Sequence, residues 1–185
     1  MSKPAANSEK FHPLTALTDA ARLFYNPVAV LRKIPREGSL RPETLRILYW
    51  GVLAGALDAL TTLLGLRDGA SGATDAVGTV ILGPIFFLLI AAVITPCYHL
   101  LALASGALGT LAASYRTIST LIPLLVLDIL FGGSLWLRLP LLAFKFFLGA
   151  LAAEHVHAAL RTRTRAVFAT VLCALAVLNI WTASL

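Results

Sequence analysis

Residues 76–104 read AVGTVILGPIFFLLIAAVITPCYHLLALA, and His99 is the one side chain among them that can carry a charge near neutral pH. The hydrocarbon core of a bilayer is about 30 Å thick, and a helix needs roughly 20 apolar residues to cross it. This stretch exceeds that length without interruption. The sequence therefore predicts a membrane-spanning helix here and, with it, an integral membrane protein.

Four further apolar stretches predict additional spans, at residues 47–66, 118–133, 137–158 and 166–185. The second and third of these belong to one apolar region, 118–153, which would reach about 54 Å as a single helix and so cannot be one crossing. Gly132, Gly133 and Ser134 supply the break. Pro140 suits the first turn of the helix that follows.

The expected fold class is all-α: a polytopic membrane helical bundle of five transmembrane helices over 45–185. Lipid offers no hydrogen-bond partners to the backbone, so such stretches form helices or closed barrels. Barrel strands would show alternating apolar and polar residues, which these stretches lack. Cys97 and Cys173 fall in different predicted spans, where a thiol acts as a small packing group.

Basic residues predict the orientation. Of the 15 lysines and arginines, 12 lie before the first span or in the turns around Arg116 and residues 161–165. The opposite side receives Arg67 and Arg138. The positive-inside rule therefore places the N-terminus in the cytoplasm and, after five spans, the C-terminus outside. The net charge of +6 is explained without a nucleic-acid partner, and the alanine, leucine and arginine bias suits a bacterial inner membrane.

Residues 1–44 form the expected cytoplasmic tail. Between Leu14 and Ile34 apolar residues recur among cations in an amphipathic pattern. Asn26 and Pro27 resemble an N-cap followed by proline at the first helical position, which predicts one helix before Tyr25 and another from Pro27. Such helices would lie on the membrane surface, attracted to anionic lipids, or pack under the bundle.

Three ionisable residues fall inside predicted spans: Asp58, Asp128 and Lys145. A charge near the bilayer centre costs about 2.5 to 3.5 kcal/mol on insertion scales, so each needs a partner. Asp128 and Lys145 flank the same turn at comparable depth, which favours an ion pair that fixes the hairpin register. The alternative is a polar cavity or ion pathway that also includes Asp58. Asp58 could instead be satisfied by Thr61 or Thr62, one helical turn away.

A second polar cluster is expected at the cytoplasmic ends of the spans, from His99, Glu154 and His157. Glu154 and His157 are three residues apart and share a helix face, whereas His155 points elsewhere. The favoured interpretation is a set of hydrogen-bonded groups at the membrane edge, with a metal site or a proton relay as alternatives. No metal and no cofactor is predicted.

Two further features of the sequence indicate helix packing and orientation in the membrane, and not catalysis. Gly51 and Gly55 form a small-residue pair four apart, which predicts close helix packing within the chain ahead of dimerisation. Arg161, Arg163 and Arg165 could hold lipid headgroups, although setting topology explains them as well. No catalytic motif is present, so an enzyme is not expected.

The order of these features resembles the YIP1 domain family of small polytopic membrane proteins. The resemblance rests on the run Phe24 to Lys33, on the five spans, and on the following residues in order: Pro96, His99, Gly106, Gly109, Tyr115, Arg116, Pro123, Glu154, His155 and His157. Eukaryotic members contact Rab-type GTPases through longer cytoplasmic regions. With its short tail, the chain resembles a bacterial-type member, which implies a non-enzymatic role in membrane organisation or protein interaction, with a membrane-protein partner or a homo-oligomer. The alternative is a small ion, proton or solute transporter.

Overall fold

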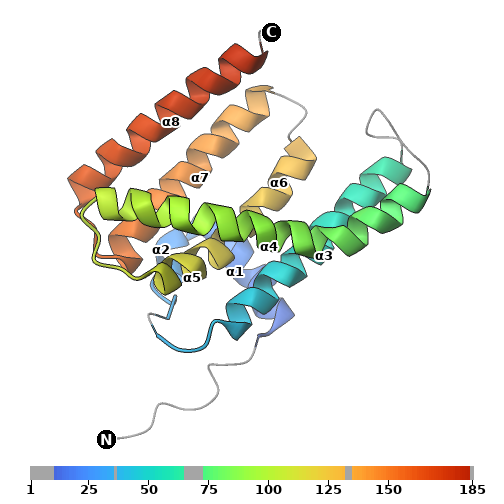
Figure 1. The fold of residues 1–185 in the computed structure, drawn as a ribbon, viewed down its shortest axis with the longest axis horizontal. Coiled ribbons are helices and arrows are strands. Elements are labelled where there is room, and N and C mark those ends of the chain that lie inside the picture. The colour runs from blue at the N-terminus through green and yellow to red at the C-terminus, as the bar shows by residue number, and fades with distance from the viewer. Residues whose placement is uncertain (1–10, 36, 65–72, 132–134, 184–185) are drawn as a thin grey trace, which may run out of the picture.

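The computed structural model describes residues 11–35, 37–64, 73–131 and 135–183, and this part of the chain is all-helical (Figure 1). The predicted break at residues 132–134 lies outside the described residues. The helices are α1 (Pro13–Tyr25), α2 (Pro27–Leu31), α3 (Arg41–Leu63), α4 (Ala73–Ala104), α5 (Leu111–Leu121), α6 (Pro123–Phe131), α7 (Leu135–Val156) and α8 (Arg161–Ala183).

Three helices are long and apolar enough to cross a membrane: α4, α7 and α8. The pair α5 and α6 passes the same test when taken together, although the two are bent by 42°. The first predicted span, 47–66, overlaps α3. Helix α3 has the same length as α8, 23 residues, but it is not among the three.

Several predicted boundaries are wrong. The predicted span 118–133 is two helices, because Pro123 has no N–H to continue α5 and the chain bends there. Thr110 begins α5, where its side chain accepts a hydrogen bond from the backbone N–H of Ala113. Helix α7 starts at Leu135, two residues before the predicted start at 137, so Pro140 lies in its second turn and not in its first. The helix predicted from residue 166 starts at Arg161, which places the three arginines inside α8.

The glycines of α3 bring its backbone against α4. A Cβ added to Gly51 would lie 2.5 Å from Pro84 Cα, and one added to Gly55 would lie 2.5 Å from Thr79 O. Gly83 of α4 approaches Gly51 O equally closely. The prediction that the glycine pair packs within the chain is therefore confirmed, and α3 and α4 form a tight hairpin.

The two N-terminal helices pack against the bundle. The Asn26 side chain accepts a hydrogen bond from Ala29 N at 3.3 Å, so the predicted cap and the break between α1 and α2 are confirmed. Leu23 and Val30 are buried with Leu124 of α6 and Leu148 of α7. Phe24 stacks on Phe144 at a centroid distance of 5.4 Å. Helices α1 and α2 therefore have a fixed position against α6 and α7.

The helices gather at one end of the molecule. Figure 1 shows α5 beside the start of α3, with the turn end of the α3–α4 hairpin and the C-terminal end of α8 far apart. Helix α5 contacts α3, α4 and α7. We call this part of the molecule, where α5 meets α3, α4 and α7, the gathered end. It holds the buried polar side chains of α5.

Candidate functional site

A layer of buried polar side chains lies on α5. Ser114, Thr117 and Ser119 are completely buried, and Arg116 and Thr120 nearly so. Several of the hydroxyls bond to the carbonyl one turn earlier, for example Thr117 to Ala113 O at 3.0 Å, and others reach neighbouring helices. These residues make α5 the polar centre of the gathered end.

The Arg116 guanidinium pairs with Glu43 of α3 inside this layer. Arg116 Nε lies 3.8 Å from Glu43 Oε1, and the two side chains are 3% and 8% exposed. Arg116 Nη2 also donates a hydrogen bond to the Gly38 carbonyl. The sequence interpretation placed Arg116 among the loop cations that set topology. The structure corrects this, because Arg116 is a buried helical residue that joins α5 to the start of α3.

Two more side-chain bonds join α3 and α5. Arg46 Nη1 donates to Thr120 Oγ1 at 3.0 Å, and the Thr44 and Tyr115 hydroxyls are 2.9 Å apart. All of these bonds are made by the first turns of α3, which precede its apolar part. The polar layer therefore orients α3 from its N-terminal end.

The predicted cluster of His99, Glu154 and His157 is only partly assembled. His99 Nδ1 lies 3.0 Å from Ser114 Oγ, which in turn lies 3.4 Å from His157 Nε2. Glu154 instead faces α8, where its carboxylate lies 3.5 Å from Arg165 and 3.9 Å from Arg161. The prediction that Glu154 joins the histidines is wrong, because the arginines in the first turns of α8 approach it from the neighbouring helix.

His157 is enclosed at the end of α7. The centroid of its ring lies 5.6 Å from that of the Tyr98 ring, and a Cβ on Gly109 would overlap the imidazole. The pKa of the His157 imidazole is lowered to about 4, mainly by burial and secondly by the charge of His99. His157 is therefore neutral at physiological pH.

This lowered pKa predicts a pH-dependent stability. Between pH 6.5 and about 4 the unfolded chain binds a proton at His157 that the folded chain does not, so stability falls as pH falls through this window. The loss should be absent well above pH 6.5 and should grow until the pH reaches about 4. Unfolding of the wild type and of His157→Gln should be compared from pH 4 to 7.5. Parallel curves for the two proteins would contradict the assignment.

The three charges that were predicted to lie inside the spans are brought together in part. Lys145 Nζ donates to Asp128 Oδ2, which forms the predicted ion pair between α7 and α6. Asp58 lines a cavity of about 690 Å³ together with Asp128, whereas Lys145 lines a second cavity. The Thr61 hydroxyl donates to the backbone carbonyl of Asp58 at 2.9 Å. Asp128 and Lys145 thus form an ion pair. The Asp58 carboxylate belongs to the wall of the cavity that Asp128 also lines.

The ion pair predicts a non-additive mutant cycle. Asp128→Asn should destabilise the protein by about 2 to 3 kcal/mol, because the Lys145 ammonium would lose its partner within the membrane. Adding Lys145→Gln should cost much less than it does alone, since no charge is then left unpaired. Chemical unfolding in detergent of the four proteins measures the coupling. Strictly additive losses would show that the residues act independently.

The three arginines of α8 differ in their surroundings. Arg161 and Arg165 are exposed and share the Glu154 carboxylate. Arg163 is exposed and, among the described residues, has no carboxylate partner. Two of the three guanidinium groups therefore share one carboxylate, and the start of α8 keeps a net positive charge.

Metal-binding groups are sparse in the described part of the chain. Among those residues, no group of three or more His, Cys, Asp or Glu side chains could hold a metal ion. Cys97 and Cys173 are free cysteines, and both are exposed.

The polar layer of α5 was not predicted from the sequence. A signal was present: residues 113–120 hold Ser114, Thr117, Ser119 and Thr120 around an arginine, and this composition is unusual at the start of a span. Its meaning depends on α3, which supplies Glu43 and Arg46 from a distant part of the chain. Comparison with protein-family models, with curated proteins and with solved structures finds no match to the chain.

Proposed function

We propose that the chain is a non-enzymatic integral membrane protein that organises or holds other membrane components. In this proposal α3 and the bent α5–α6 pair cross the bilayer together with α4, α7 and α8, which gives the five spans of a bacterial-type YIP1-like protein. The N-terminus lies in the cytoplasm, in an inner membrane. The resemblance of the sequence to that family supports the proposal, as does the concentration of cations at the predicted cytoplasmic end.

The observation that carries the proposal is the docking of α1 and α2. Because Leu23 and Val30 are buried in the bundle, the outer face of α1 is presented in a fixed position. That face is apolar, with Leu14 77% and Tyr25 74% exposed, and it carries the Arg22 cation. A rigid face that is both apolar and basic suits contact with the membrane surface and with a partner protein seated there.

Co-purification from native membranes tests this role. Wild-type protein should retain a stoichiometric protein partner or form a homo-oligomer, and the double variant Leu14→Ser, Tyr25→Ser should lose it. Leu108→Ser is the matched control, because Leu108 is 91% exposed in the turn before α5. Loss of the partner in the control as well, or a wild type without partner or oligomer, would contradict the proposal.

Transport is the second candidate, favoured by the cavity that Asp58 and Asp128 share. A pathway charge acts on permeation more than on packing. If transport is the function, Asp58→Asn should change ion or proton flux in proteoliposomes and leave the melting temperature nearly unchanged. Under the organising role the wild type carries no specific flux. A flux abolished by Asp58→Asn in a normally folded protein would replace the first proposal.

A further inference from the structure

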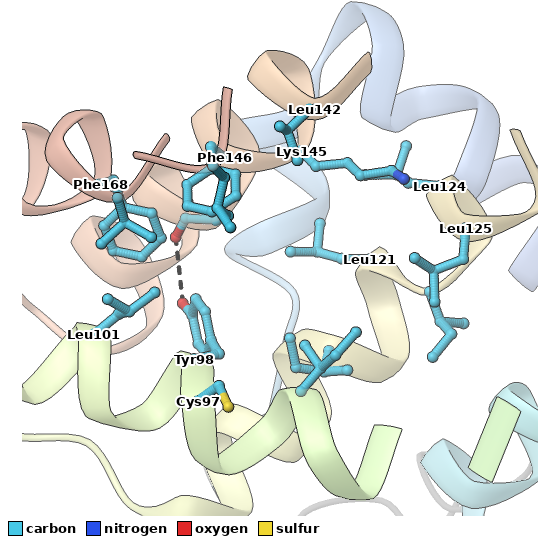
Figure 2. A pocket seen from close by; sticks show the side chains of 16 residues that line it. Cys97, Tyr98, Leu101, Leu121, Leu124, Leu125, Leu142, Lys145, Phe146 and Phe168 are labelled. Atoms are coloured by element: carbon cyan, nitrogen blue, oxygen red, sulfur yellow. Dashed lines mark hydrogen bonds between the residues drawn. The ribbon is translucent and has the colours of Figure 1, made fainter. Parts of the chain in front are cut away.

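We propose that the cavity between α4, α5–α6, α7 and α8 binds one acyl chain of an anionic phospholipid, whose phosphate lies at the arginines that begin α8. Figure 2 shows this cavity, with Tyr98 and Cys97 on one wall and Phe146 and Phe168 on another. It has a volume of about 460 Å³. It is separate from the cavity of Asp58 and Asp128.

The helices that form the walls determine whether lipid or water enters the cavity. Three of them are α4, α7 and α8, the helices long and apolar enough to cross a membrane. The cavity is open to the outside of the bundle. In a bilayer its mouth therefore faces lipid hydrocarbon, and water is kept from it.

The lining favours hydrocarbon over a polar ligand. Its residues are almost all aliphatic or aromatic, and the tyrosine and the lysine among them are already engaged. The Tyr98 hydroxyl donates to Gly149 O at 3.4 Å, and Lys145 is paired with Asp128. A polar ligand would lose its own hydrogen bonds to water without replacement, whereas an acyl chain has none to lose.

The size of the cavity favours a slender chain over a helix. A helix about 10 Å across with a pitch of about 5.4 Å occupies on the order of 400 Å³ per turn. The cavity would therefore hold about one turn, whereas a partner helix that crosses the bilayer has several. A flexible acyl chain can follow the space between the four walls and leave it at the membrane edge.

The headgroup position follows from the spacing on α8. Arg165 and Arg161 precede Phe168 by three and seven residues, so they lie on the same side of α8 as the wall of the cavity, one and two turns away. They share Glu154, so two guanidinium groups lie at one carboxylate and a net positive charge remains on this side of α8. A phosphate can therefore contact this end of α8 while its chain fills the cavity.

Native mass spectrometry with added phosphatidylglycerol or phosphatidylcholine tests the chain site. Cys97→Phe places a ring in the cavity and should abolish the retained phosphatidylglycerol adduct. Cys173→Phe is the matched control, because Cys173 is also an exposed cysteine but does not line the cavity. It should keep the adduct. Melting temperatures of both variants show whether each is folded, and an adduct that persists in a folded Cys97→Phe protein would overturn the proposal.

The headgroup requires a separate measurement. Arg165→Gln should reduce the preference for phosphatidylglycerol over phosphatidylcholine about fivefold, the factor that corresponds to roughly 1 kcal/mol per basic residue. Arg138→Gln, an exposed arginine at the other end of α7, should leave the preference unchanged. Equal binding of both lipids by the wild type would overturn the headgroup assignment. A dimer that Cys97→Phe dissociates, with no lipid adduct in the wild type, would assign the cavity to a second copy of the chain.

Discussion

Arg116→Met should lower the free energy of unfolding by about 3 to 5 kcal/mol, the largest effect expected of any single charge in the protein. The substitution leaves the Glu43 carboxylate buried without its cation and removes the bond to the Gly38 carbonyl. Both partners are almost completely enclosed, so water cannot replace the lost interaction. Unfolding in a detergent titration measures the change.

Two further variants serve as controls for Arg116→Met. Glu43→Gln combined with Arg116→Met should recover much of the loss, because neither member of the pair is then left as a buried charge without its partner. Arg165→Gln removes an exposed arginine that also pairs with a carboxylate and should cost less than about 1 kcal/mol. If Arg116→Met were as mild as Arg165→Gln, the buried pair could not be what holds α3 to α5.

Gly83→Ala should destabilise the protein by about 1 to 3 kcal/mol, because the new methyl group would press on the backbone of α3. Its Cβ would lie 2.5 Å from Gly51 O, and a backbone oxygen in a packed helix cannot move aside as a side chain can. Thermal unfolding in detergent provides the measurement.

Gly78→Ala is the matched control on the same helix. No described atom lies within 4 Å of the Cβ that would be added at Gly78. Alanine is a better helix former than glycine, so this change should be neutral or stabilising by up to about 1 kcal/mol. Equal destabilisation by both substitutions would show that the α3–α4 seam is not closely packed.

The long apolar helices α4, α7 and α8 could be predicted because they depend on a local property. A run such as residues 76–104 satisfies the thickness of the bilayer wherever its neighbours lie, and α4 covers it. The cap at Asn26 and the glycine contacts of α3 follow from similarly local rules. The ion pair of Asp128 and Lys145 could be predicted because the two residues flank one turn.

The polar layer depends on residues that are far apart in the chain. The spacing of Glu154 and His157 predicts a shared helix face, but it does not say which helix faces each residue. In the structure Arg165 of α8 reaches Glu154 and Ser114 of α5 reaches His157. Arg116 was misplaced for the same reason, since its partner Glu43 lies in a segment assigned to the tail.

The proposed membrane topology is tested most directly by a reporter fused after Leu185. A matched pair of reporters, one active only in the cytoplasm and one only outside it, should be compared in the same position. The cation excess at the gathered end and an odd number of crossings predict activity outside the cytoplasm alone. Activity of the cytoplasmic reporter after Leu185 would contradict the five-span arrangement.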